Sequence, residues 1–297
     1  MPSEPLTLGI DIGGTRLRAG LVDGNGALRA RAETATDARG GPAAVVAQIV
    51  ALVTDVSAGV ARGDLRGAGV SAPGPLDTGR GVALGVPTLS GWVDVPIAAM
   101  LAEALGLPVR LENDGIAAAN GEWRFGAGRG RSNLVYVTVS TGLGGGVVAD
   151  GRLLRGRFGM AGHIGHMTVV RDGAPCPCGN RGCWEAYASG TAFAARAGRE
   201  PPAVFAAAAA GDAAALALVG EQADWLGIGI ANLFHLYSPE LVILGGGIAS
   251  GFALLEAGIR ARLARNAMPA FRGVEVVAAA LGDNAGLVGA AALLFED

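Results

Sequence analysis

One strand–turn–strand pattern occurs twice in this chain, and the repeat restricts the possible fold more than any other feature. In the first copy, apolar runs at 6–10 and 16–22 flank a glycine-rich turn. In the second copy, apolar runs at 134–140 and 147–149 flank another. A pattern that restarts after about 130 residues indicates two related units, each built on its own sheet. We therefore predict a duplicated α/β fold of two lobes with a ligand cleft between them.

The remaining apolar segments supply each unit with further strands and helices. Runs with the length of buried strands lie at 65–70, 109–112, 239–244 and 274–278. Helical spacing is present at 42–61, 96–105, 114–123, 216–237 and 285–294. We expect residues 1–118 to form the N-terminal lobe, joined by a closing helix at 285–297. Residues 119–284 are expected to form a larger C-terminal lobe that carries the cysteine-rich loop.

Composition and charge exclude several classes of partner. The chain has 297 residues, a net charge of −3 and no basic block, so binding to nucleic acid through phosphate neutralisation is not expected. The first residues lack the basic start and apolar core of a signal peptide, and no run of about 18 apolar residues predicts a membrane span. A cytoplasmic protein without nucleic-acid or membrane partners is the expectation.

Three glycine clusters follow apolar runs, at 11–15, 140–146 and 245–247. The first lies between two strands, which argues against a dinucleotide fingerprint, because that motif needs a helix after the turn. Bare backbone can present N–H groups to phosphate oxygens, and Asp11 could hold Mg²⁺ through water. We interpret the three clusters as contacts to one phosphate-bearing ligand. For the first cluster taken alone, a tight β-hairpin with a capping Asp is an equal alternative.

The three cysteines of the chain, Cys176, Cys178 and Cys183, lie within eight residues. An odd and clustered set is a poor disulfide framework and is more typical of a metal or redox site.

Four motifs, in this order, resemble the ROK family of repressors, open reading frames and kinases. They are Asp11-Ile12-Gly13-Gly14-Thr15, Glu112-Asn113-Asp114, Ser140 to Gly146, and Cys176 to Glu185. The resemblance extends from about residue 7 to the end of the chain. It implies the actin-like ATPase (ribonuclease H-like) fold, with ATP and a monosaccharide in the cleft and a homodimer or homotetramer. The implied activity is that of an ATP-dependent hexose kinase, similar to bacterial glucokinases, that acts on the 6-hydroxyl of glucose or a related hexose.

The resemblance also assigns roles to individual residues. Asp114 would be the base that accepts the proton of the sugar hydroxyl. Sugar contacts would come from Gly74, Thr88, Asn113, Asp114, Gly142, His163, His166 and Glu185. ATP and Mg²⁺ would be held by Asp11, Gly13, Gly14, Thr15, Arg16, Thr141, Gly142, Gly144, Gly246 and Gly247. A structural Zn²⁺ would be bound by His166, Cys176, Cys178 and Cys183, a donor set typical of closed tetrahedral sites.

Simpler interpretations of these residues stay open. An Asn-Asp pair before a helix is also a common N-cap, and both roles are compatible at Asn113 and Asp114. The cysteines could be free buried thiols or a redox pair, and Glu185 could be a solvated loop residue.

His163 is the main departure from the family pattern, because kinases of the family usually have Glu at this position. A neutral imidazole donates from one nitrogen and accepts at the other, whereas a carboxylate only accepts. His163 and Thr88 therefore keep open an N-acetylmannosamine kinase, a sugar-sensing regulator and a non-catalytic sugar-binding homologue. Family repressors carry an N-terminal winged helix domain, and with Asp11 so close to the start none is expected here.

Overall fold

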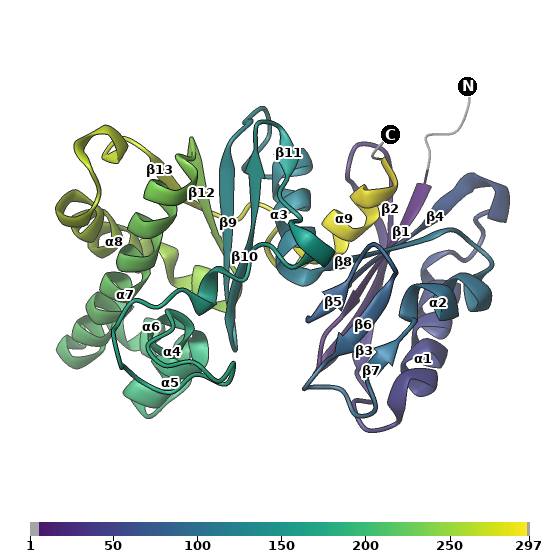
Figure 1. The fold of residues 1–297 in the computed structure, drawn as a ribbon, viewed down its shortest axis with the longest axis horizontal. Helices are drawn as coiled ribbons and strands as arrows, with labels where there is room; N and C mark the ends of the chain where they lie inside the picture. Colours follow the sequence, from purple (N-terminus) through teal and green to yellow (C-terminus); the bar gives the residue numbers. More distant parts are fainter. Residues whose placement is uncertain (1–5, 296–297) are drawn as a thin grey trace. The chain divides into compact units, whose positions relative to one another are not determined.

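The computed structural model describes residues 6–295, which divide into two compact units (Figure 1). The first unit combines the chain up to Arg129, the segment Leu153–Ala161 and the chain from Asp283 onward. The second unit comprises Gly130–Arg152 and Gly162–Gly282. The chain therefore passes between the units more than once.

Each unit contains a five-stranded mixed sheet, and the two sheets have the same strand order. The first sheet has the order β3-β2-β1-β4-β8 and the second has the order β11-β10-β9-β12-β13. In both, an antiparallel hairpin continues into parallel strands on its other side. The duplication predicted from the repeated pattern is thus present in the topology.

The strands of the first sheet are β1 (Leu6–Ile12), β2 (Arg16–Val22), β3 (Leu28–Ala35), β4 (Leu65–Ala72) and β8 (Val109–Asn113). Those of the second are β9 (Leu134–Val139), β10 (Leu143–Ala149), β11 (Arg152–Leu153), β12 (Leu241–Gly245) and β13 (Glu275–Ala278). A small third sheet is formed by β5 (Leu76–Asp77), β6 (Val82–Gly85) and β7 (Val93–Val95). Strands this short contain too few residues for alternation to predict them.

The helices of the first unit are α1 (Gly41–Val56), α2 (Ile97–Leu105), α3 (Asp114–Phe125) and α9 (Ala285–Ala292). Those of the second are α4 (Glu185–Ala188), α5 (Gly190–Ala197), α6 (Pro201–Ala209), α7 (Ala213–Tyr237) and α8 (Phe252–Asn266). Short 3₁₀ turns lie at Arg62–Asp64, Arg157–Gly159, Ile164–His166, Gly247–Gly251, Pro269–Phe271, Gly282–Asn284 and Leu293–Phe295. Within residues 6–295, no helix has both the length and the apolar character that a membrane crossing requires.

The closing helix α9 packs directly on backbone that carries no side chain. A Cβ atom added to Gly9 in β1 or Gly69 in β4 would overlap the carbonyl oxygens of Leu287 and Ala290 in α9. On its other side, α9 packs against α3, where a Cβ on Gly289 would overlap the carbonyl oxygen of Ala117. Figure 1 shows α9 in yellow beside the strands at the start of the chain. Glycine at these positions lets the helix approach closely enough to complete the core of the first unit.

The predicted boundary at residue 118 is corrected by this packing. Because α3 packs against α9, the whole of α3 belongs to the first unit, which continues to Arg129. Segment Leu153–Ala161 also belongs to the first unit, so the second unit is not the larger of the two. The closing helix lies in the first unit, and residues 296–297 of its predicted range lie outside the described residues.

We expect Gly289→Ala to destabilise the protein although alanine favours helix. The added methyl group would overlap backbone of α3, and overpacking of this kind typically costs about 1–3 kcal/mol. Gly220→Ala in α7 is the matched control, because a Cβ there meets no atom within 4 Å. This control should be neutral or stabilising by up to about 1 kcal/mol. Urea denaturation of both variants checks the prediction, and equal midpoints would contradict it.

Candidate functional site

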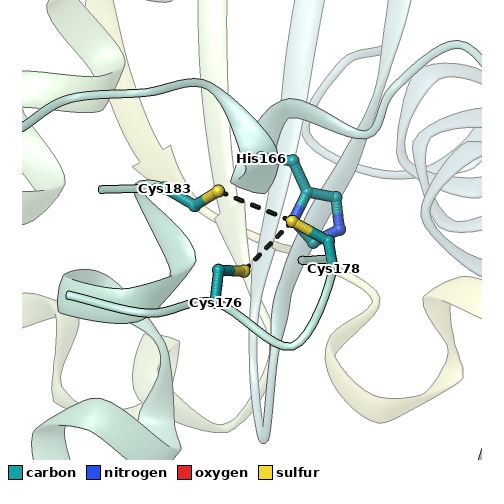
Figure 2. Close-up of side chains that lie close together, drawn as sticks. All are labelled: His166, Cys176, Cys178 and Cys183. Atoms are coloured by element: carbon teal, nitrogen blue, oxygen red, sulfur yellow. Dashed lines mark hydrogen bonds between the residues drawn. The ribbon is translucent and has the colours of Figure 1, made fainter. Parts of the chain in front are cut away.

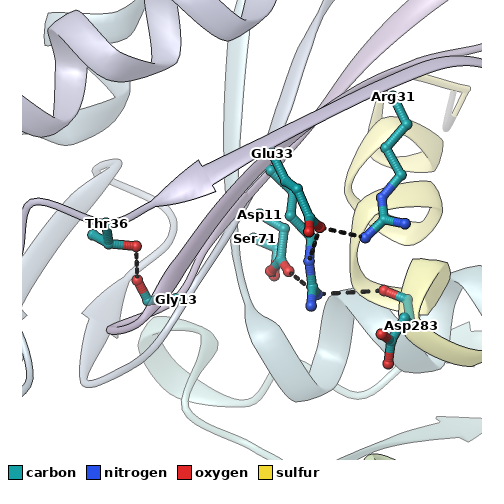
Figure 3. Close-up of polar contacts among 8 residues, drawn as sticks. Asp11, Gly13, Arg31, Glu33, Thr36, Ser71 and Asp283 are labelled. Carbon is teal, nitrogen blue, oxygen red and sulfur yellow. Dashed lines mark hydrogen bonds and ion pairs between the residues drawn. The ribbon is translucent and has the colours of Figure 1, made fainter.

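In the first unit, the predicted nucleotide-binding residues form a tight hairpin at the ends of β1 and β2. The Gly13 N–H donates to the Arg16 carbonyl at 2.9 Å, and the Thr36 hydroxyl donates to the Gly13 carbonyl at 2.7 Å (Figure 3). Thr88 packs on this turn, because its Cβ lies 2.9 Å from where a Gly14 Cβ would stand. Thr15 and Arg16 are exposed. The structure therefore brings Thr88, predicted to bind sugar, next to residues predicted to bind phosphate.

The Asp11 carboxylate at the end of β1 accepts two side-chain hydrogen bonds. Ser71 Oγ donates to Oδ1 at 2.9 Å, and Arg18 Nη1 donates to Oδ2 at 3.2 Å. The Arg18 guanidinium also approaches Glu33 Oε2 at 3.7 Å and the Asp283 carbonyl at 3.4 Å (Figure 3). Burial raises the pKa of Asp11, and the bonds from Ser71 and Arg18 oppose that rise. Neither Arg18 nor Ser71 was identified from the sequence, since each meets Asp11 only through strand pairing.

Asp114 begins α3, directly after the residue that caps this helix. Asn113 Oδ1 accepts from the backbone N–H groups of Gly115 at 3.0 Å and Ile116 at 3.4 Å, so the N-cap expected at Asn113 is present. Asp114 Oδ1 accepts from the Gly115 N–H at 2.8 Å. The residue nevertheless keeps a solvent-exposed surface.

The carboxylate of Asp114 has an elevated proton affinity. Desolvation by the surrounding protein is the largest cause, and the negative charge of Asp11 adds to it, so that the pKa of Asp114 is raised to about 6. Hydrogen bonds from Gly115 and Asn113 act in the opposite direction. An accessible carboxylate with a pKa near neutrality is suited to accept a proton from a bound hydroxyl group.

In the second unit, a cavity of about 360 Å³ lies beside the turn that follows β9. Ser140 and Thr141 line it together with the start of α5, the start of α6 and Gly247. The loops are tied together, because the Gly190 N–H donates to the Ser140 carbonyl at 2.7 Å and the Gly247 N–H donates to Ser140 Oγ at 3.1 Å. Of the predicted nucleotide residues, Thr141 and Gly247 line this cavity.

Several residues of this cavity were missed by the sequence interpretation. They are Thr191 and Ala194 in α5, and Glu200, Pro201 and Pro202 at the start of α6. A Glu-Pro-Pro sequence signals only a helix start, which gives no indication that its residues face a cavity.

The glycines of β10 lie in a strand, whereas the sequence was interpreted as a turn over these residues. Gly144 to Gly146 pair with β9 as strand residues rather than forming a turn. Ile164 packs on Gly145, and its Cδ1 lies only 2.6 Å from the position that a Gly145 Cβ would occupy. In the same way, a Cβ on Gly165 would overlap the Leu143 carbonyl oxygen. The loop 162–166 thus lies directly on β10. Packing does not explain Gly144, because a Cβ there would make an ordinary 3.7 Å contact with Thr138.

Gly246 follows β12 and has a φ of +79°, a conformation that favours glycine. A Cβ on Gly246 would lie 2.5 Å from the Val139 carbonyl oxygen. Gly247 meets nothing within 4 Å, so its missing side chain opens the cavity rather than allowing packing.

The predicted metal ligands come together in the second unit. One ligand atom from each of His166, Cys176, Cys178 and Cys183 lies within 4.8 Å of all the others (Figure 2). Cys176 Sγ is 3.7 Å from His166 Nδ1, and Cys178 Sγ is 3.7 Å from Cys183 Sγ. No disulfide joins the three cysteines. This group could hold a metal ion.

Glu185 links the cysteine cluster to the turn before β10. Its Oε2 accepts from the Leu143 N–H at 2.8 Å, and the Cys176 thiol lies 3.8 Å from Oε1. Gly142 allows this approach, because a Cβ there would be 2.7 Å from Oε2. Glu185 is therefore a structured, half-buried residue rather than a solvated loop residue.

His163 precedes the 3₁₀ turn that carries His166, and the two rings stack with centroids 6.1 Å apart. Burial lowers the pKa of His163, which favours the neutral imidazole near pH 7. The predicted sugar residues are thus divided. Gly74, Thr88, Asn113 and Asp114 lie in the first unit, whereas Gly142, His163, His166 and Glu185 lie in the second.

Comparisons with known proteins identify relatives over the full length of the chain. The model of the ROK family matches residues 7–297. The glucokinase of Thermotoga maritima is 36% identical, with 100% of this chain and 99% of the relative covered. The N-acetylmannosamine kinase of Citrobacter koseri is 39% identical, with 98% and 99% covered. The crystal structure of a ROK family glucokinase from Streptomyces griseus, in complex with glucose and AMPPNP, matches with a TM-score of 0.86 and 38% identity over 97% of this chain and 98% of that one.

We predict that removing the charge of Asp11 lowers the pKa of Asp114. Asp11→Asn eliminates a like charge that disfavours the ionised form of Asp114, so the carboxyl group should titrate below its wild-type midpoint of about 6. Carbon-13 NMR of labelled aspartate side chains measures this midpoint. The exposed Asp64→Asn variant should leave it unchanged, and equal midpoints in all three proteins would contradict the coupling.

Proposed function

The chain belongs to the ROK family and has its actin-like ATPase fold, and from this we propose that it is an ATP-dependent hexose kinase. We further propose that it transfers the γ-phosphoryl group of ATP to the 6-hydroxyl of glucose or a related hexose. The observation that carries the proposal is the Asp114 carboxylate, whose pKa is raised to about 6 at the capped start of α3.

Asp114 acts as the general base in this proposal. As the sugar oxygen forms its bond to the γ-phosphorus, the bond from that phosphorus to the bridging oxygen breaks and ADP leaves. The hydroxyl proton passes to the Asp114 carboxylate. Because the transition state of phosphoryl transfer is loose, the base mainly orients the hydroxyl and accepts its proton late. Asn113 keeps Asp114 in place through the helix cap, and its amide nitrogen is a donor for a neighbouring sugar hydroxyl.

We assign nucleotide contacts separately within each unit. In the second unit, the cavity beside Ser140, Thr141 and Gly247 has about 360 Å³ for part of a nucleotide. In the first unit, the turn Gly13–Arg16, with Thr15 and Arg16 exposed, offers bare backbone and one guanidinium group to phosphate oxygens.

Asp11 is the proposed contact to Mg²⁺. Both of its carboxylate oxygens already accept hydrogen bonds, from Ser71 and Arg18, so a water of the hydrated ion fits this position better than direct coordination. When bound, Mg²⁺ would neutralise charge on the phosphate oxygens.

A second sugar class is supported by His163. A neutral imidazole can donate to a carbonyl oxygen, which a glutamate at the same position cannot do. An amide-bearing hexose such as N-acetylmannosamine is therefore the alternative substrate. The homodimer or homotetramer that the resemblance implies stays a prediction.

We also propose that the cysteine cluster binds a structural Zn²⁺. With Zn–S bonds of about 2.3 Å, the edge of a tetrahedron between two sulfurs is about 3.8 Å, and a sulfur–nitrogen edge is about 3.6 Å. The separations of 3.7 Å for both pairs agree with these lengths. Burial raises the pKa of the Cys176 thiol to about 12 and also raises that of Cys183, so a cation is needed to stabilise their thiolates. Three protein sulfurs and one imidazole leave no open position, which favours a structural role.

We expect Asp114→Asn to lose hexose phosphorylation while retaining sugar binding. Loss of a general base typically reduces turnover by about 10²–10⁴-fold. Coupled ADP release and calorimetric binding, measured with glucose, mannose and N-acetylmannosamine, check this, with the exposed Asp94→Asn as control. In the wild type, turnover should decrease as the pH falls below about 6, since only ionised Asp114 accepts a proton.

Turnover of Asp114→Asn close to wild type would remove the proposed base. If N-acetylmannosamine is the preferred sugar and His163→Glu moves the preference to glucose, the second sugar class replaces the first. If no sugar is phosphorylated, the protein is instead a non-catalytic, sugar-binding homologue.

We expect the purified protein to contain one zinc ion per chain by elemental analysis. Cys178→Ser should lower the zinc content and the urea midpoint, because it removes one of four ligands. His235→Gln is the matched control, since His235 accepts from the Met268 N–H outside the cluster and should not affect zinc. Full zinc retention in Cys178→Ser would contradict the assignment.

A further inference from the structure

A second cavity, of about 500 Å³, lies in the first unit along β8, the edge strand of its sheet. Its wall comes from the loop Thr78–Gly81, from Val109–Glu112 in β8, and from Ala98, Arg155 and Leu293. It contains none of the residues that we assign to sugar, nucleotide or metal. Its chemistry therefore needs its own explanation.

Three guanidinium groups line this cavity. Arg110 Nη1 donates to the Leu293 carbonyl at 2.7 Å, and this partner is neutral. Arg80 Nη1 lies 3.8 Å from Asp77 Oδ2, and the Arg80 side chain is 70% exposed. Arg155 Nε donates to Glu112 Oε2 at 2.7 Å. Among residues 6–295, the lining of this cavity thus includes three guanidinium groups and one carboxylate, that of Glu112, in a chain whose total charge is −3.

The buried Glu112 carboxylate makes Arg155 a structural part of this wall. The residue is 1% exposed, and an ionised carboxylate at that depth requires a cationic partner, which Arg155 supplies. With Arg155 paired to Glu112, Arg80 and Arg110 provide the remaining positive charge. A metal cation is disfavoured by the three guanidinium groups, and a neutral sugar finds mainly donors in these side chains.

We propose that this cavity is a binding site for a phosphoryl group carried by a small molecule. Guanidinium groups bind phosphate oxygens with paired N–H donors, and Arg80 and Arg110 both line this cavity. The volume of about 500 Å³ accommodates free phosphate as well as a sugar phosphate.

The site is connected to the end of β8 that carries Asn113. Glu112 Oε1 accepts from the Asn113 N–H at 3.0 Å, while Oε2 holds Arg155. A phosphoryl group that shares the Arg155 guanidinium weakens its pairing with Glu112. Ligand binding at this cavity therefore alters the contacts of Glu112, which accepts the Asn113 N–H directly before Asp114. The cavity is thus positioned to regulate the proposed base.

The test uses the full chain, with inorganic phosphate and glucose 6-phosphate as probes in isothermal titration calorimetry at low ionic strength. We expect saturable binding that Arg80→Ala and Arg110→Ala each weaken by about tenfold or more. Arg62→Ala is the matched control, because Arg62 also donates to a backbone carbonyl, that of Leu105, at 2.7 Å but does not line the cavity. It should bind both probes like the wild type.

For the binding that the Arg80 and Arg110 variants weaken, a higher affinity for glucose 6-phosphate than for phosphate identifies a sugar phosphate as the ligand, and equal affinities identify free phosphate. Binding of glucose 6-phosphate that neither variant weakens belongs to the proposed catalytic site. Arg80 is largely exposed, so its variant keeps the test valid even if Arg110→Ala disturbs the contact with Leu293. The proposal is overturned if neither probe saturates, or if the Arg80 variant binds both probes with wild-type affinity. This outcome is independent of kinase activity, because the readout is binding alone.

Discussion

Close contact between α9 and bare backbone is the constraint on which the first unit depends. Glycines in β1, β4 and α9 allow the helix to lie against two strands and against α3 at once. Because Asp11 lies one residue before the end of β1 and α3 begins at Asp114, the same contact fixes the two carboxylates relative to each other. Their electrostatic coupling, which contributes to the raised pKa of Asp114, follows from backbone packing rather than from any bond between them.

The elements with long periodic patterns were predictable, and those defined by tertiary contacts were not. The two hairpins and their parallel partners follow from apolar runs, and α2 ends at Leu105, where the helical spacing at 96–105 also ends. The small sheet of β5, β6 and β7 was missed because its strands have two to four residues. Helix α1 ends at Val56 rather than near 61, since the chain turns at Gly59 with a φ of +80°.

In the candidate site, too, some residues could be predicted from the sequence, and those defined by tertiary contacts could not. The clustering of the three cysteines alone indicated a metal or redox site, whereas the roles of Asp114 and His166 were predicted from the family resemblance. The glycines of β10 were interpreted as one group, because a glycine bare for a ligand and a glycine bare for a crossing loop look alike in sequence. Only the position of Ile164 over Gly145 distinguishes the two cases. Arg18 was missed because it meets Asp11 only through the pairing of β1 with β2. The start of α6 was missed because the other residues of its cavity come from distant segments.

The interleaved course of the chain has a consequence for biosynthesis. The first unit receives its last helix, α9, only after every residue of the second unit has been made. During synthesis on a ribosome, the second unit can therefore reach its native state before α9 has packed on β1 and β4. Until then the nascent N-terminal portion exposes an incomplete apolar surface, which is a natural target for chaperones. An excised fragment ending before residue 283 would remain in that condition permanently.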